Sequence, residues 1–493
     1  MAEHTYDLIV RDVDLVRPGV EGVERTSIAI RDGRIAAVSP DLDPADAAES
    51  FDGTGRLAFP GCVDSHQHWG IYNELGADTE SESRACAQGG VTSAITYMRT
   101  GQYYLNKGGP YAEIYPEVRE TSEGRAYVDY AFHLAPMMKQ HIDEIPELVE
   151  NQGVTSFKVF MFYGSHGLHG RSADQNSFLM IPEGERYDYA HFEFVMRGIQ
   201  AARERFPDKA DVISLSLHCE AAEIMTAYTE IVEREGTLTG LEAYSASRPP
   251  HSEGLAISIA SYLAHETQLA NINLLHLSSH KAVDAALRMS KAFPHIDFRR
   301  EVTIGHLLAD FTTASGIGGK VNPPLRGRDD VDALWDYVLD GTIDWVISDH
   351  ACCRDEVKFG EPRDDVFLAK SGFGGTEYLL AGLISEGRNR GLSLNRVAEL
   401  VSRNQAQRYG LRNKGDIAVG YDADIAIVDP DSPWTVRAAD SLSSQEYTPF
   451  EGFEMTARVT DTFLRGTHVL QDGKVVGDPQ GRYLSRPTAE PAA

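Results

Sequence analysis

The chain has 493 residues, of which 42% are hydrophobic and 24% charged, and its formal net charge is −28. This length allows one large barrel with a smaller second domain, and the acidic balance disfavours nucleic acids and anionic membranes as partners. No run approaches the roughly 18 consecutive apolar residues of a membrane-spanning helix, and no signal peptide is visible, so the expected location is the cytoplasm.

Both ends of the chain have the pattern of β-strands and tight turns. Residues 1–58 contain two strand-like runs with Asp-Gly between them in RDGRIAAV, which is typical of a β-hairpin. A similar pattern returns in residues 411–477. We therefore expect one small β-sandwich domain built from both segments. Residues 478–493 are expected to form a C-terminal tail, whose last nine residues (SRPTAEPAA) look disordered.

Residues 59–410 alternate short apolar strands with helical segments, such as the one over 394–410 that Gly410 would close as a C-cap. This alternation predicts an α/β fold, a parallel (β/α)8 TIM barrel. A doubly wound open sheet has the same periodicity and stays an alternative. The eight candidate strands are 58–65, 92–98, 126–135, 155–163, 211–219, 272–279, 297–304 and 344–349.

Polar side chains occur at the ends of five of these strands, where a parallel barrel carries its reactive residues. A single strand histidine is more often structural than a ligand, but five such coincidences favour a metal site. A lysine inside a buried strand must be paired, neutral or modified. The candidate ligands are His66, His68, Lys158, His218, His276 and Asp349.

A lysine among four histidines and an aspartate has one chemical explanation as a ligand. An ammonium cannot bind a cation, but a neutral amine that takes up carbon dioxide becomes a carbamate, which can bridge two metal ions. Imidazole and oxygen ligands together suit Zn²⁺, with Mn²⁺, Co²⁺ or Fe²⁺ less favoured. Besides the shared carbamate, one ion would take His66, His68 and Asp349, and the other His218 and His276.

The stretch FPGCVDSHQH (59–68) resembles the P-G-x-x-D-x-H-x-H signature of the amidohydrolase superfamily. TSFKVFMFY (155–163) is similar to the carboxylated-lysine strand of the dihydropyrimidinase/hydantoinase family, and LHCE, NLLHLSS, KVNPPLR and VISDHA follow in that family's order. The resemblance spans nearly the whole chain. It implies a (β/α)8 barrel with a binuclear metal centre, N6-carboxylysine at Lys158, a homotetramer or homodimer, and hydrolysis of a small cyclic amide.

A mechanism follows from this resemblance. Two metal ions can bridge a water and lower its pKa toward neutrality, so that a metal-bridging hydroxide attacks the amide carbonyl. Asp349 would carry the proton to the departing nitrogen, and Tyr163 would hydrogen-bond the oxyanion. The positions of Asn322 and Ser371 imply contacts with the substrate, made largely through the backbone.

Residues 164–178, after Tyr163, are polar and rich in glycine. Such a composition is compatible with a mobile lid over the pocket. His166 and His169 in this segment are expected to be solvated loop residues rather than further ligands.

Departures from the family pattern bear on the substrate. Dihydroorotase-like members have an arginine two residues after the second histidine, where this chain has Gly70, and allantoinase-like members usually lack the tyrosine that Tyr163 supplies. The sequence therefore favours ring opening of a dihydropyrimidine, a hydantoin or a related cyclic imide or ureide. Allantoinase- or dihydroorotase-like ring opening is the alternative. A noncatalytic interaction protein of this fold is disfavoured, because all six ligand positions are filled.

Overall fold

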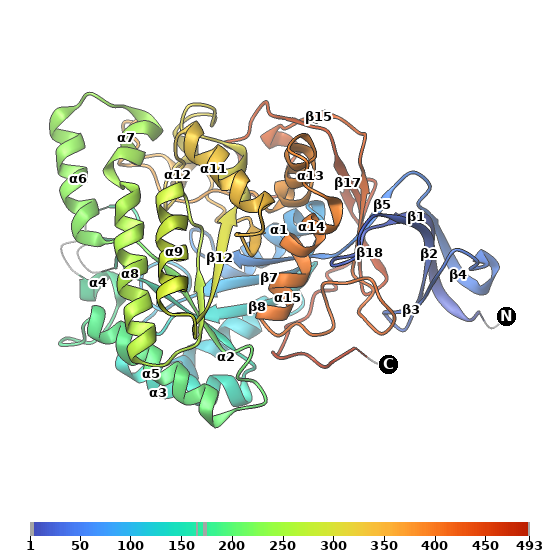
Figure 1. Cartoon of the computed structure of the whole chain (residues 1–493), viewed down its shortest axis with the longest axis horizontal. Helices are drawn as coiled ribbons and strands as arrows, with labels where there is room; N and C mark the ends of the chain where they lie inside the picture. Colours follow the sequence, from blue (N-terminus) through green and yellow to red (C-terminus); the bar gives the residue numbers. More distant parts are fainter. Residues whose placement is uncertain (1–3, 164–165, 171–174, 492–493) are drawn as a thin grey trace.

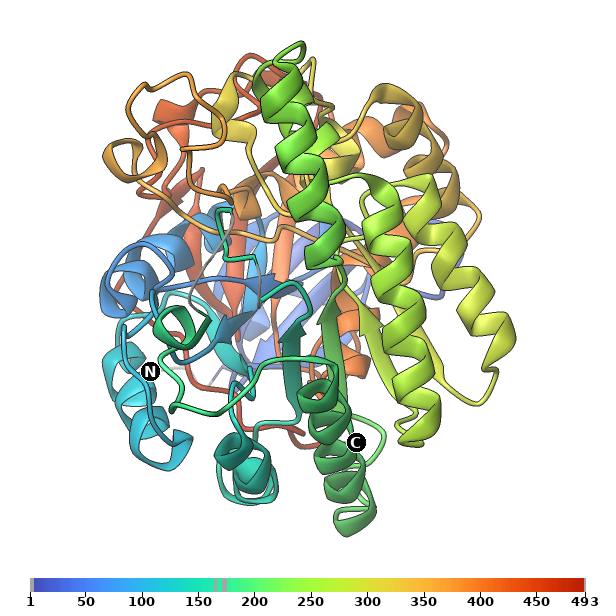
Figure 2. The same ribbon diagram turned by 90° about the vertical axis from the view of Figure 1, so that its left-hand side faces the viewer.

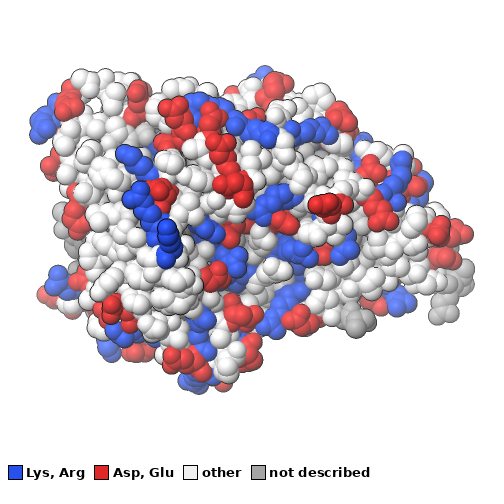
Figure 3. All heavy atoms as spheres, viewed as in Figure 1, with Lys and Arg blue, Asp and Glu red and all other residues white. Residues whose placement is uncertain are grey.

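The computed structural model describes residues 4–163, 166–170 and 175–491. A barrel of parallel strands wrapped by helices fills most of the molecule, and a second, larger sheet extends from one side of it toward the N-terminus (Figure 1). The predicted α/β barrel fold is confirmed. Acidic and basic side chains are interspersed over the face shown in Figure 3.

Eight parallel strands form the barrel in the order of the chain. The backbone N–H of His68 donates to the carbonyl of His350 over 2.8 Å, and this contact brings the last strand against the first. Each of the eight overlaps one of the strands expected from the sequence. They are β6 (Cys62–Gln67), β7 (Val91–Met98), β8 (Asp129–Leu134), β9 (Ser156–Phe160), β10 (Ser214–His218), β11 (Asn271–Leu274), β12 (Asp297–Thr303) and β13 (Trp345–Ile347).

Helices surround the parallel strands, as the turned view shows (Figure 2). None of the described helices combines the length and apolar character needed to cross a membrane. The α-helices are α1 (Leu75–Gln88), α2 (Tyr111–Ser122), α3 (Lys139–Asn151), α4 (Gln175–Leu179), α5 (Tyr189–Arg205), α6 (Ala222–Glu235), α7 (Gly240–Ser247), α8 (Pro250–Glu266), α9 (His280–Ala292), α10 (Ile304–Leu308), α11 (Arg328–Leu339), α12 (Asp355–Lys358), α13 (Leu379–Asn389), α14 (Leu394–Ala398) and α15 (Asn404–Arg408). Short turns of helix are η1 (Pro44–Asp46), η2 (Ile317–Gly319), η3 (Thr376–Tyr378) and η5 (Ala438–Asp440).

The helix expected over residues 394–410 is continuous but not uniform. One π-helical turn, η4 (Glu399–Arg403), separates α14 from α15. Gly410 follows the helix with φ 77°. Glycine adopts this left-handed conformation without strain, so Gly410 ends the helix as expected.

Strands from both ends of the chain join in one nine-stranded sheet. Asp32 and Gly33, with φ of 53° and 75°, form the expected hairpin turn. The strands are β1 (Tyr6–Leu15), β2 (Glu24–Arg31), β3 (Arg34–Ser39), β4 (Ala47–Asp52), β5 (Leu57–Pro60), β14 (Ile425–Asp429), β17 (Arg458–Leu464), β18 (Thr467–Gln471) and β19 (Lys474–Val475); β15 (Trp434–Thr435) and β16 (Glu454–Met455) pair separately. The domain limits at 58, 410 and 477 stay a prediction.

The expected first barrel strand, residues 58–65, contains parts of two strands. β5 belongs to the nine-stranded sheet, and β6 begins the barrel after Gly61. A Cβ at Gly61 would lie 2.2 Å from the Oγ1 of Thr92. Only glycine therefore fits where the chain passes from one sheet to the other.

The C-terminal segment is ordered, contrary to the expectation of disorder from residue 485, which is wrong for residues 485–491. The backbone N–H of Leu484 donates to the carbonyl of Tyr130 over 2.7 Å. Arg486 is 1% exposed and donates to the Oγ of Ser156 and the carbonyl of Phe132. Composition did not predict this order, because it comes from backbone pairing and a single buried guanidinium.

Candidate metal centre and substrate pocket

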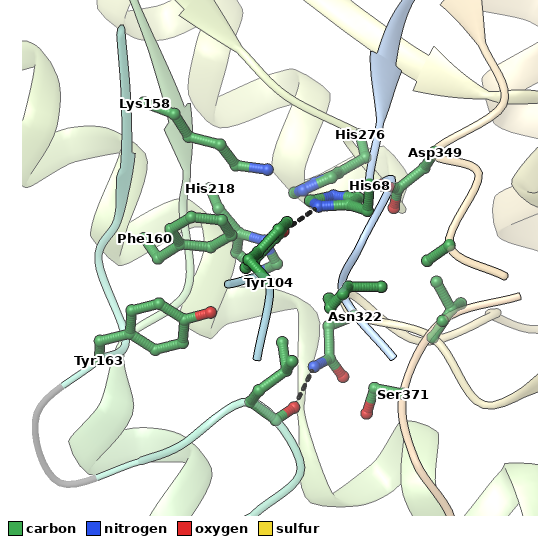
Figure 4. Close-up of a pocket in the computed structure, with 15 residues that line it drawn as sticks. His68, Tyr104, Lys158, Phe160, Tyr163, His218, His276, Asn322, Asp349 and Ser371 are labelled. Carbon is green, nitrogen blue, oxygen red and sulfur yellow. Dashed lines mark hydrogen bonds and ion pairs between the residues drawn. The ribbon is translucent and has the colours of Figure 1, made fainter. Parts of the chain in front are cut away.

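One cavity at the carboxyl ends of the barrel strands is lined by most of the predicted site residues. The amine of Lys158, the hydroxyl of Tyr163 and the rings of the histidines converge on it (Figure 4). His66 lies directly behind this lining, with its Nε2 3.0 Å from the Nζ of Lys158. The other eight of the nine predicted site residues line the cavity: His68, Lys158, Tyr163, His218, His276, Asn322, Asp349 and Ser371.

Strand geometry brings these side chains together. His66 and His68 are two residues apart at the end of β6 and so share a face. His276 and Asp349 follow β11 and β13 with φ of 34° and 54°. Such left-handed conformations are unusual for residues other than glycine and cluster at functional sites. The backbone is therefore strained where two of the proposed ligands project into the cavity.

The ring nitrogens of His66 and His68 converge on one carboxylate. Asp349 Oδ1 lies 3.1 Å from His66 Nε2 and 3.2 Å from His68 Nε2. One ligand atom from each of the three residues lies within 4.8 Å of the other two. Burial raises the pKa of Asp349 to about 6. Two imidazoles and a carboxylate at this spacing fit one divalent cation.

Lys158 is fully buried beside this group. Its Nζ lies 3.7 Å from the ring centroid of Tyr97 and 4.2 Å from that of Phe160. Burial lowers the pKa of Lys158 to about 7. The neutral amine that carbamate formation requires is therefore accessible near neutral pH.

His218 and His276 form the other half of the site. Their ring centroids are 4.2 Å apart. The Nδ1 of His276 is buried and has no hydrogen-bond partner among the residues that the structure describes. A buried ring nitrogen without a partner costs free energy, so this donor pair fits a second cation.

Three residues that the sequence analysis did not single out orient the histidines through their remaining ring nitrogens. Such partners fix the ring and tautomer of a metal ligand. Glu220 had a weak signal, two residues after His218, and Glu301 is an acid inside a buried strand, but nothing in the sequence marked Tyr104. The contacts are Glu301 Oε1 to His66 Nδ1 (2.7 Å), Tyr104 OH to His68 Nδ1 (2.6 Å) and Glu220 Oε2 to His218 Nε2 (2.7 Å).

Tyr163 directs its hydroxyl into the cavity (Figure 4). The guanidinium of Arg99 lies 5.2 Å from its ring centroid and 5.5 Å from that of Tyr104. Burial raises the pKa of Tyr163. Its hydroxyl therefore keeps its proton at neutral pH and can donate it to an oxyanion in a hydrogen bond.

The side chain of Asn322 is already used within the protein. Its Oδ1 accepts from the hydroxyl of Tyr244 over 2.5 Å, and its Nδ2 donates to the carbonyl of Leu168 over 2.8 Å. This arrangement leaves the backbone of Asn322 for a ligand. Ser371 lies on the same wall, with its Oγ 3.3 Å from the hydroxyl of Tyr244.

The segment after Tyr163 departs in part from its expected exposure. His166 is 2% exposed, and its Nδ1 lies 3.1 Å from the Oγ1 of Thr226, so the expectation that it is solvated is wrong. The Nδ1 of His169 accepts from the backbone N–H of Ser371 over 3.1 Å. The proposed lid over 164–178 falls partly on residues 164–165 and 171–174, which lie outside the described residues.

Gly70 has little space for a side chain. Its φ is 80°, and a Cβ there would lie 3.1 Å from the Cα and Cβ of Leu75. An arginine at this position would therefore be strained in its backbone and tightly packed against Leu75.

Comparisons with known proteins agree with this geometry. A sequence model of the Amidohydrolase family matches residues 188–476. Among curated proteins, an allantoinase of Rubrobacter xylanophilus is 33% identical over 495 residues, covering 98% of each chain. An allantoinase of Desulfitobacterium hafniense is 30% identical, covering 97% of this chain and 98% of its own.

Solved structures with this fold belong to proteins with other enzyme names. The dihydropyrimidinase from Brevibacillus agri superposes with a TM-score of 0.82 at 26% identity, covering 98% of this chain and 99% of its own. The L-hydantoinase (dihydropyrimidinase) from Arthrobacter aurescens superposes with a TM-score of 0.83 at 27% identity, covering 98% and 100%. Sequence and structure comparisons thus agree on the kind of protein and differ in the substrate that the relatives' names give.

Proposed function

This chain belongs to the amidohydrolase family, and we propose that it opens a cyclic amide by hydrolysis, with a hydantoin-type ring as the substrate. The observation that carries the proposal is the fully buried Lys158, whose amine lies 3.0 Å from a histidine nitrogen in a cavity that also holds an acid and a tyrosine hydroxyl. A buried lysine in such surroundings fits a modified ligand better than a structural cation.

We propose that Lys158 becomes N6-carboxylysine and, with the five other donors, holds two divalent metal ions. Zn²⁺ suits the donor set first, with Mn²⁺, Co²⁺ or Fe²⁺ as alternatives. When bound, two such ions lower the pKa of a water and polarise a carbonyl. The five other donors are His66, His68, His218, His276 and Asp349.

The chain's own residues supply the proton transfer and the orientation. A water oxygen adds to the ring carbonyl carbon, the ring C–N bond breaks, and a carboxylate product forms. Asp349 accepts the proton from the attacking water on a carboxylate oxygen and returns it to the departing nitrogen. The hydroxyl of Tyr163 donates to the oxyanion, and the backbone at Asn322 and Ser371 holds the ring amide.

Two kinds of ring are candidates for the natural substrate. The curated relatives named allantoinase favour allantoin, which is a hydantoin ring with a ureido substituent. The structural neighbours and the hydroxyl of Tyr163 in the cavity favour a hydantoin or dihydropyrimidine. Because allantoin and hydantoins share the five-membered ring, we propose this ring as the common element of recognition.

The test is turnover by the metal-replete protein against a matched set of rings: hydantoin, 5-substituted hydantoins, allantoin, dihydrouracil, dihydroorotate and cyclic imides. Carboxylate product is quantified by chromatography. We expect the highest kcat/KM with one of the rings that contain a hydantoin. A clear preference for dihydroorotate, or hydrolysis of open-chain amides alone, would refute the proposal.

We further propose that the protein is cytoplasmic and a homodimer or homotetramer. All five cysteines are free and buried, which fits a reducing compartment. Neighbouring helices α5, α6 and α8 carry large apolar side chains that are at least 36% exposed, and such surfaces mark contacts between subunits. They are Tyr189, Phe194, Tyr228, Leu255 and Tyr262.

A further inference from the structure

A line of buried hydrogen bonds runs from His218 to the opposite wall of the cavity. Glu220 Oε2 lies 2.7 Å from His218 Nε2. Arg248 donates to both oxygens of Glu220, over 2.9 Å from Nε and 2.5 Å from Nη2. The Nη1 of Arg248 lies 3.3 Å from the hydroxyl of Tyr244, which reaches Asn322.

Every member of this line is shielded from water. Glu220 is 0% exposed, Arg248 1% and Tyr244 3%. The guanidinium of Arg248 keeps its charge at every physiological pH, and it forms a two-point ion pair with the Glu220 carboxylate. Removing one partner of such a pair leaves an uncompensated buried charge. The line is therefore a rigid element of the pocket.

The hydrogen-bond directions in this line are determined by the chemistry of its members. Arginine can only donate, so the hydroxyl of Tyr244 accepts from Arg248 and gives its own proton to Asn322 Oδ1. Asn322 Nδ2 is then free to donate to Leu168. At the other end, Glu220 occupies the Nε2 of His218 and leaves its Nδ1 for the cavity. The line thus sets both the ring orientation of His218 and the amide orientation of Asn322.

We infer that Arg248 and Tyr244 are positioning residues that hold the substrate wall of the pocket, at Asn322 and Ser371, in register with the metal ligand His218. This inference rests on the proposed ring-opening function, because that function makes the wall a substrate contact. Neither residue touches the reacting atoms. Both act through the distance and angle between the ring amide and the ligand His218.

The first test is Tyr244→Phe, which removes one hydroxyl and keeps the aromatic ring. The centroid of that ring lies 4.6 Å from the Nζ of Lys320. The variant leaves Asn322 Oδ1 without its donor, and a buried unsatisfied oxygen weakens the geometry that it supports. We expect KM for the best ring substrate to rise about five- to thirtyfold. We expect kcat within about twofold of wild type and metal content, by inductively coupled plasma mass spectrometry, unchanged.

The matched control is Tyr115→Phe. Tyr115 is 1% exposed, and its hydroxyl lies 2.7 Å from that of Tyr483, away from the cavity, so this variant also removes a buried tyrosine hydroxyl. Its KM should equal that of wild type. The second test is Arg248→Lys, which keeps the charge beside Glu220 but loses the planar fork that reaches Tyr244. We expect it to keep its metal and to raise KM less than Tyr244→Phe does, because the Tyr244 hydroxyl still donates to Asn322 Oδ1.

The double variant Arg248→Lys/Tyr244→Phe distinguishes positioning from general damage. Because both changes break the contact between Arg248 and Tyr244, the rise in KM of the double variant should be smaller than the product of the two single effects. A KM within twofold of wild type for Tyr244→Phe, or additive effects in the double variant, would overturn the inference. If wild type opens none of the rings, the proposed function fails instead, and the two failures are distinguished.

Discussion

Replacing Glu301 by glutamine should weaken metal binding although Glu301 is not a proposed ligand. Its Oε1 lies 2.7 Å from His66 Nδ1, and both side chains are 0% exposed. Its Oε2 accepts from the Nε1 of Trp345 over 2.8 Å. Glutamine is nearly the same size and keeps one oxygen for the indole, so the packing should survive.

The magnitude follows from the lost contact with His66. A buried donor left without an acceptor costs about 1–3 kcal/mol, and the glutamine NH₂ would meet the ring N–H of His66 as one donor against another. That free energy corresponds to metal affinity weakened about 5- to 150-fold. This range agrees with the effect that such partners usually have on metal sites, about 10- to 100-fold.

The assay is a competition titration of the metal-loaded protein with a chromophoric chelator. The control is Asp461→Asn, because Asp461 is a buried carboxylate 3.3 Å from a histidine, His468, in the nine-stranded sheet. The control should bind metal as wild type does. Equal metal affinity of Glu301→Gln and wild type would show that the carboxylate does not orient His66.

Three further predictions concern single side chains. Asp349→Asn should retain metal and lose kcat by about 10²- to 10⁴-fold; substantial remaining kcat would contradict its role in proton transfer. Lys158→Ala should lose the binuclear centre and recover part of it with small carboxylates such as acetate, whereas two tightly bound ions without any additive would exclude the carbamate. Burial lowers the pKa of Lys358 to about 7, while the unfolded chain keeps the ordinary value of about 10.4. Between these values only the unfolded chain binds the proton, so the free energy of unfolding should rise with pH by up to about 1.4 kcal/mol per unit. The difference in Tm between wild type and Lys358→Met should therefore shift in favour of wild type from pH 7 to pH 9. Parallel Tm curves would refute the assignment.

The barrel was predictable because its strands are short apolar runs with a polar residue at the end. Each of these signals lies within a few residues of sequence. Such short-range signals could not separate β5 from β6 at Gly61, where two strands of different sheets follow each other directly, and so predicted one strand. Their short range also explains the error in the C-terminal segment, whose partners Tyr130 and Ser156 lie more than 300 positions earlier.

Within the site, residues that project from strand ends could be predicted, and those that support them could not. Glu301 contacts His66 across 235 positions of sequence. Tyr104 lies in a loop and has φ 55°, a conformation that no local pattern predicts for tyrosine. Arg248 precedes two prolines, so the local sequence indicates only the end of a helix. Their roles depend on the fold of the whole barrel, which places distant segments side by side.

The nine-stranded sheet combines strands from both ends of the chain, so it can be completed only late in translation. β5 ends at residue 60, and its antiparallel partner β14 begins at residue 425. β1 precedes β5 and pairs with one of its edges, but at about 5–20 residues per second translation leaves the other edge without its partner for roughly 20–70 s. A free strand edge invites pairing with another chain. The yield of this protein should therefore depend on what shields residues 57–60 while the barrel is still being synthesised.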